Sequence, residues 1–124
     1  AMERNILIVS RDNFLREMVR FALKDLPAAI HCTADAEGAA RVADRTQLDC
    51  ILLLGAAPLL GGGREAAVLR PGGVRRPKLV VVAWQHAEQT VLGLLENGVD
   101  QYMTFPVNLQ RLYAKVAGII DTRI

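Results

Sequence analysis

The sequence predicts an α/β fold in which helices cover both faces of a parallel β-sheet. Short apolar runs alternate along the chain with segments whose apolar residues recur at helical spacing. The runs are almost continuously apolar, which is typical of strands buried on both faces of a parallel sheet. The chain has 124 residues, 52% hydrophobic and 23% charged. These values are typical of one globular domain with its own core.

Three apolar runs predict the first strands, at residues 5–9, 29–34 and 50–54. The segments after the first two runs predict helices, because their apolar residues recur at helical spacing from Leu15 to Leu26 and from Ala39 to Ala43. Asp12 and Asp35 stand just before these segments. Aspartate at such a position predicts an N-cap, because its carboxylate accepts a free backbone N–H of the first turn.

The second half of the chain predicts two further strands and the helices beside them. Residues 78–83, rich in valine, and residues 100–104 are predicted strands. Residues 88–97 and 107–120 predict helices from their spaced leucine and valine side chains. A short helix at residues 64–70 is the weakest assignment, because a Pro-Gly-Gly sequence follows it directly.

Charge and hydropathy exclude several functions. Fifteen basic against thirteen acidic side chains give a formal net charge of +2, too weak to indicate nucleic-acid or membrane binding. Arg70, Arg75, Arg76 and Lys78 form a basic cluster without interleaved aromatics, which favours a solvated loop over an anionic partner. No apolar run approaches the roughly 18 residues of a membrane span. We expect a cytoplasmic protein with no direct nucleic-acid or membrane binding.

Four stretches resemble the receiver domain of response regulators in two-component signalling. They read NILIVSRD, TADAEGAARV, DCILLLGAAPLLGG and LLENGVDQYMTFPV. Pro58 and Gly62 match the family's residues four and eight positions after the end of the third strand, and Tyr102 and Pro106 match its switch aromatic and a proline near the fifth strand. The resemblance covers residues 1–124 as a single receiver-like domain. It implies a flavodoxin-like (βα)5 doubly wound sheet with strand order 2-1-3-4-5.

The resemblance also implies where phosphoryl-transfer residues should stand, and each is replaced. The family holds Mg²⁺ with two acids after the first strand. It phosphorylates an Asp at the tip of the third strand, assisted by a Thr or Ser and a Lys. These positions fall on Ser10, Arg11, Leu54, Ala83 and Phe105. We therefore expect a pseudo-receiver with no catalytic residue, no metal and no cofactor.

The replacements predict local structure at the strand tips. We expect Leu54, Ala83 and Phe105 to form a small apolar plug in place of a catalytic cleft. The family resemblance predicts a cis peptide bond between Phe105 and Pro106. Tyr102 either stays in one rotamer, which we favour because Ala83 offers no hydroxyl, or moves when a partner binds.

The two cysteines are expected to be reduced core thiols. There is no CxxC motif, and His31 and His86 lie far apart in sequence, so the chain offers no metal-ligand pattern. In the implied strand order, the strands of Cys32 and Cys50 flank the first strand, which separates them by about 9–10 Å. A disulfide needs Cα atoms closer than about 7 Å.

The first functional hypothesis is a non-phosphorylatable pseudo-receiver that serves as a protein–protein interaction module in bacterial two-component-type regulation. Its partner is another protein or a second copy, bound through the face formed by the fourth helix, fifth strand and fifth helix. The candidate contacts are Trp84, Gln89, Asp100, Gln101, Arg111 and Tyr113. Trp84 has two interpretations, partly buried packing or an exposed anchor for a partner.

Two other functions stay open at this point. The modified cleft, lined by Arg11, Trp84 and Phe105, could sense a small molecule, because the carboxyl ends of the strands are the usual ligand site of such sheets. An enzyme or flavoprotein of similar topology is the third hypothesis. It is the weakest, because the sequence shows no nucleophile–base pair and no phosphate-cradling loop after the first strand.

Overall fold

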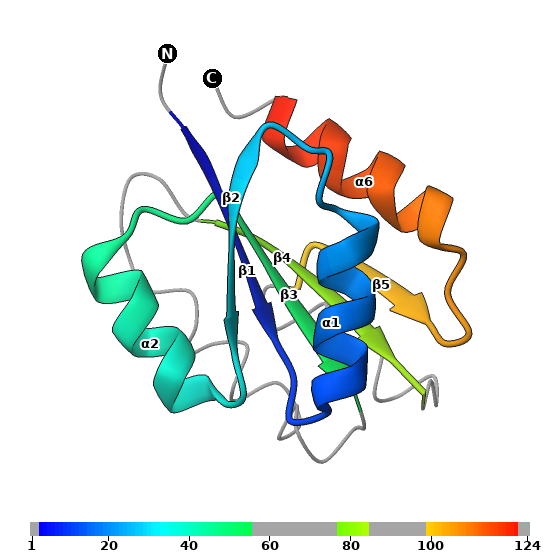
Figure 1. Ribbon diagram of the computed structural model, residues 1–124, viewed down its shortest axis with the longest axis horizontal. Helices are drawn as coiled ribbons and strands as arrows, with labels where there is room; N and C mark the ends of the chain where they lie inside the picture. The colour runs from blue at the N-terminus through cyan, green and yellow to red at the C-terminus, as the bar shows by residue number, and fades with distance from the viewer. Residues whose placement is uncertain (1–2, 56–76, 85–98, 122–124) are drawn as a thin grey trace.

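The structure is a computed structural model that describes residues 3–55, 77–84 and 99–121 (Figure 1). Several sequence predictions lie outside these residues. They are the helices at residues 64–70 and 88–97, the family positions Pro58 and Gly62, the candidate contact Gln89, and the basic residues Arg70, Arg75 and Arg76.

A five-stranded parallel sheet forms the centre of the domain, in the order β2-β1-β3-β4-β5. The strands are β1 (Arg4–Val9), β2 (Ala28–Thr33), β3 (Cys50–Gly55), β4 (Lys78–Ala83) and β5 (Gln101–Thr104). Their bounds differ from the predicted ones by at most one residue. The fold class and the strand order predicted from the sequence are confirmed.

Helices lie on both faces of the sheet, as Figure 1 shows. They are α1 (Asn13–Ala22), α2 (Ala36–Arg45) and α6 (Leu109–Asp121). On one face α1 and α6 lie beside each other and supply buried residues such as Val19 and Val116 to one core. On the other face α2 supplies Ala39 and Val42 to a second core.

Side-chain alternation along each strand produces the two cores. In β3, Leu52 and Leu54 face the core of α1 and α6, whereas Ile51 and Leu53 face the core of α2. All four side chains are at most 1% exposed, because β3 is the middle strand and both its faces are covered. This double burial explains why the strand sequences are continuously apolar.

Three capping residues set where the helices begin. The Asp12 carboxylate accepts the N–H groups of Phe14 at 2.8 Å and Leu15 at 3.2 Å, which confirms its predicted N-cap role. Asp35 accepts the N–H of Gly38 at 2.8 Å, as predicted for α2. The Asn108 side chain accepts the Arg111 N–H at 3.1 Å. The last helix therefore begins after Asn108, two residues later than the apolar spacing predicts.

The first helix ends earlier than its apolar spacing predicts. It stops at Ala22, and Leu23 is its C-cap. Leu23 and Leu26 are nevertheless buried, because the turn after the helix carries them onto the same core. Helical spacing therefore predicted the buried side chains correctly and the length of the helix wrongly.

The cysteines lie on the two strands that flank β1, where Cys32 is level with Ile8 and Cys50 with Ile6. Neither forms a disulfide bond, as predicted. Cys50 is fully buried, but Cys32 is only half-buried because β2 is the end strand of the sheet. Desolvation by burial raises the pKa of the Cys32 thiol, and the positive charge of Arg20 partly opposes this shift. Among the described helices, none has the length and hydropathy needed to cross a bilayer.

We predict that removing the α2 cap destabilises the domain. Asp35→Ala should lower the free energy of unfolding by about 1 kcal/mol, because the Gly38 N–H loses its acceptor. Asp35→Asn is the matched control, since its side-chain oxygen still accepts this bond. Urea unfolding measures both variants. Equal losses would contradict the capping role.

Candidate functional site

The carboxyl ends of the central strands meet at one edge of the sheet. The register sets Gly55 of β3 level with Ala83 of β4, and Ala83 level with Thr104 of β5. Phe105 follows β5, and its N–H donates to the Ala83 carbonyl at 3.0 Å. This register brings the predicted positions at Leu54, Ala83 and Phe105 to the same edge.

Leu54 and Phe105 are packed into the core that lies against α1 and α6. Leu54 is 0% exposed and Phe105 is 7% exposed. The peptide bond between Phe105 and Pro106 is cis, as predicted. The apolar plug predicted from the sequence is correct for these two residues.

Trp84 covers the outer side of Phe105. The two rings are stacked, with centroids 4.6 Å apart and an interplanar angle of 29°. Trp84 itself remains 51% exposed. The ring is therefore packed against Phe105 and also partly exposed, and its use as an anchor for a partner stays a prediction.

Ala83 does not belong to this plug. It is fully buried in the other core, on the α2 side of the sheet. The reason is strand alternation: Leu54 pairs with Val82, so the next residue in β4 points to the opposite face. Tyr102 packs against that second core, and burial raises its pKa. Whether Tyr102 moves stays a prediction.

The polar groups in the turn after β1 form hydrogen bonds with the first residues of α1 and the residues just before it. Ser10 is 1% exposed, and its hydroxyl accepts the Asp12 N–H at 3.1 Å. The Ser10 carbonyl accepts an N–H of the Arg16 guanidinium. Asp12 uses its carboxylate as the α1 cap, and Arg11 is exposed beside it.

This turn does not fit Mg²⁺. Divalent magnesium needs several hard oxygen ligands, commonly carboxylates. The turn offers one carboxylate, already engaged as a helix cap, next to the positive charge of Arg11. Within residues 3–55, 77–84 and 99–121, no group of three or more His, Cys, Asp or Glu side chains could hold a metal ion.

The candidate contacts near β5 differ in their burial and in the partners they have within the domain. The Asp100 carboxylate accepts the Leu79 N–H at 2.8 Å and lies 3.9 Å from the Lys78 ammonium. It is therefore engaged within the domain. Gln101 is half-buried in β5. Tyr113 is half-buried against the α1/α6 core, whereas Arg111 is exposed.

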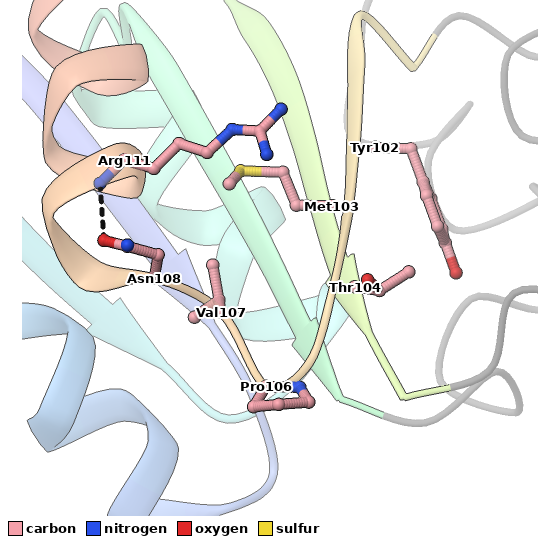
Figure 2. Close-up of a pocket in the computed structure, with 7 residues that line it drawn as sticks. All are labelled: Tyr102, Met103, Thr104, Pro106, Val107, Asn108 and Arg111. Carbon is pink, nitrogen blue, oxygen red and sulfur yellow. Dashed lines mark hydrogen bonds between the residues drawn. The ribbon is translucent and has the colours of Figure 1, made fainter.

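A cavity of about 310 Å³ lies where β5 continues into α6 (Figure 2). Its lining residues are Tyr102, Met103, Thr104, Pro106, Val107, Asn108 and Arg111. Sequence reasoning named Arg111, Tyr102 and Pro106 but missed the cavity itself. Nothing in the sequence indicates it, because it depends on side chains that leave both faces of one strand.

Comparisons with known proteins agree with this fold. No protein-family model matches the chain. The chain is 29% identical over 119 residues to the alkaline phosphatase synthesis transcriptional regulatory protein PhoP of Bacillus subtilis, covering 96% of the chain and 49% of that protein. It is 29% identical over 115 residues to response regulator MprA of Mycobacterium leprae, covering 93% of the chain and 50% of that protein.

Solved receiver structures superpose along nearly the whole chain. A response regulator receiver protein from Pseudoalteromonas atlantica has a TM-score of 0.81 at 20% identity, covering 94% of this chain and 97% of that one. A two-component response regulator from Clostridium difficile has a TM-score of 0.77 at 23% identity, covering 97% and 98%. The chain is thus similar in sequence to response regulators and has the fold of their receiver domains. The chain spans about half the length of the curated relatives it matches.

We predict that an Asp at the strand tip is poorly tolerated. Leu54→Asp should lose at least about 2 kcal/mol of stability, since it removes a buried leucine side chain. Burial should raise the pKa of the new carboxyl above its usual value near 3.9. The loss should therefore grow as the pH rises from about 4 to 8, because the folded state disfavours the charged form.

Leu54→Asn is the matched control for that measurement. Its side chain is close in shape to aspartate and does not titrate, so its stability loss relative to the parent should not change with pH. Urea unfolding at several pH values compares the two variants. If Leu54→Asp is as stable as Leu54→Asn at every pH, the tip of β3 is not in the core.

We predict a measurable energetic coupling between Trp84 and Phe105. A double-mutant cycle with Trp84→Leu, Phe105→Leu and the combined variant should give about 0.5–1.5 kcal/mol, the usual range for an aromatic pair. The domain contains one tryptophan, so its fluorescence follows unfolding in the variants that retain it, and circular dichroism follows all four. If the stability losses of the two single variants add up to that of the combined variant, the stacking of the two rings contributes no energy.

Proposed function

We propose that this receiver domain does not accept a phosphoryl group and acts by binding a protein in two-component-type regulation. The observation that carries the proposal is the fully buried Leu54 at the tip of β3. Phosphoryl transfer requires an oxygen nucleophile in line with the leaving group and cations that neutralise the developing charge. A leucine side chain supplies no such oxygen.

The neighbouring side chains support the same proposal. A lysine at the end of β5 would be a desolvated and unpaired charge if no carboxylate stood opposite it, which costs several kcal/mol. Phe105 stands there instead and is covered by Trp84. The turn after β1 offers a helix cap and a cation where a metal would need two acids. The nucleophile, the metal ligands and the cation are all replaced.

A regulatory role by protein binding fits what remains. The curated relatives are transcriptional regulatory proteins and response regulators. A domain of this kind that does not accept a phosphoryl group can still regulate another protein by binding it. The surface around β5 and the start of α6 presents exposed side chains, among them Arg111. These exposed side chains support a partner surface on the face of β5 and α6, with the fourth-helix segment as its predicted continuation.

The alternative, a small-molecule sensor using Arg11, Trp84 and Phe105, has less support. The aromatic rings that would line its cleft stack on each other at 4.6 Å, and Phe105 is buried. A ligand would have to separate the two rings before it could use the Phe105 face. A bound species in native mass spectra of the purified protein would favour the sensor.

We predict that the domain is inert to the phosphoryl mimic beryllofluoride. Amide NMR spectra of the ¹⁵N-labelled protein, recorded with and without Mg²⁺ and beryllofluoride, should coincide at Ser10, Leu54, Ala83 and Phe105. The reason is that beryllofluoride needs a carboxylate to bind at the strand tip.

A receiver domain that retains an Asp at this position serves as the positive control for the reagents. Saturable shifts at the four residues of the present chain would overturn the proposal. They would mean that the domain still completes a phosphoryl site by another route.

A further inference from the structure

The cavity beside α6 is bounded on one side by β5. It is lined by three successive strand residues, Tyr102, Met103 and Thr104. Successive side chains of a strand point to opposite faces. Tyr102 indeed packs on the α2-side core and Met103 on the α1/α6 core. A cavity that contacts three successive residues lies along the strand, beside the first residues of α6.

β5 is the last strand of the described sheet and pairs only with β4. In a parallel sheet the backbone groups of alternate residues point to opposite sides of the strand. Half of the N–H and C=O groups of β5 are therefore directed away from β4, toward the side on which the cavity lies. Such an edge is a template for an added strand.

Arg111 is the only charged side chain among the seven that line the cavity. Figure 2 shows it reaching from α6 over Met103 toward β5. Its backbone N–H is bonded to Asn108, but within the described part of the chain its guanidinium has no hydrogen bond or ion pair. A guanidinium presents a planar fork of donors that matches a carboxylate.

We propose that the outer edge of β5 binds an extended acidic segment of a partner protein. The segment's backbone pairs with the outward groups of β5, and one of its carboxylates binds the Arg111 guanidinium. The apolar parts of Met103, Val107 and Pro106 contact the methylene groups of the acidic side chains, which share one face of the added strand. A cavity of about 310 Å³ lies at the low end of the roughly 300–1,000 Å³ that ligand pockets span, and it has room for a few side chains of such a segment. This inference rests on the proposed function and names the chemistry of the partner.

A second copy of the chain is the less favoured occupant of this edge. In a two-fold pairing of β5 with β5, the same surface meets itself, so each Arg111 needs an acid from the same region of the other copy. The acid that directly precedes β5, Asp100, already accepts the Leu79 N–H and lies beside Lys78. A partner that brings its own carboxylate satisfies Arg111 directly.

The test uses an acetylated, amidated pentapeptide of alternating valine and glutamate, titrated into the ¹⁵N-labelled domain. We expect saturable amide shifts at residues 101–104 and at the Arg111 side chain. The same peptide with glutamine in place of glutamate should bind at least about tenfold more weakly, because a charge-assisted hydrogen bond is lost. Equal shifts with both peptides, or none with either, would overturn the proposal.

Two protein variants separate the guanidinium from general attraction. Arg111→Gln should lower the affinity for the acidic peptide about tenfold and leave the affinity for the glutamine peptide unchanged. Lys115→Gln is the matched control, an exposed cation on the same helix but outside the cavity lining. Equal weakening by the two substitutions would mean that net charge, not this cavity, attracts the peptide. Dispersed amide spectra verify that both variants fold.

Backbone pairing has its own test. Two versions of the peptide are compared, one N-methylated on the odd-numbered residues and the other on the even-numbered residues. Each version therefore loses the backbone N–H groups along one edge of the added strand. One version should bind and the other should not. If both bind alike, the peptide does not pair with β5.

The outcomes distinguish this inference from the proposed function. Failure of the peptide to bind, with no response to beryllofluoride, overturns the inference alone. A saturable beryllofluoride response overturns the proposed function whatever the peptide does. Concentration-dependent sedimentation of the domain that is abolished by Arg111→Gln would assign the edge to a second copy and overturn the acidic partner.

Discussion

Burial of β3 on both faces is the constraint on which the rest of the structure depends. β3 lies between β1 and β4, with one core under α1 and α6 and another under α2. Its last core residue, Leu54, is therefore surrounded by apolar side chains rather than by water. A carboxylate at that point would need a cation or metal and hydrogen bonds to offset its desolvation. Without them an apolar tip is the more stable arrangement.

The neighbouring features follow from that apolar tip. Phe105 fills the end of β5 against the same core, and Trp84 covers its outer face. In the turn after β1, Ser10 and Asp12 support the start of α1. Packing thus occupies the carboxyl edge at Leu54 and Phe105. On another part of the domain, the exposed side chain of Arg111 lines the cavity beside β5.

Much of the fold was predictable because local patterns and tertiary packing agree. Continuous apolar runs predicted the strands, and Asp12 and Asp35 predicted the helix starts through a short-range hydrogen bond. The burial of Leu54 and Phe105 followed from the family positions they occupy. The family position of Ala83 did not predict the face of the sheet on which it lies, because that face depends on the pairing register of β3 and β4. The engagement of Asp100 and the cavity at β5 also depend on contacts between distant segments, which no local pattern indicates.

The central claim is that the strand tip has no group that can be phosphorylated. Intact-mass spectrometry after incubation with Mg²⁺ and acetyl phosphate tests it most directly, with a receiver that retains its strand-tip Asp treated in parallel. The account predicts that the mass of this domain stays unchanged while the control gains one phosphoryl group. A gain of one phosphoryl group that is lost in alkali, as expected of an acyl phosphate, would contradict the account.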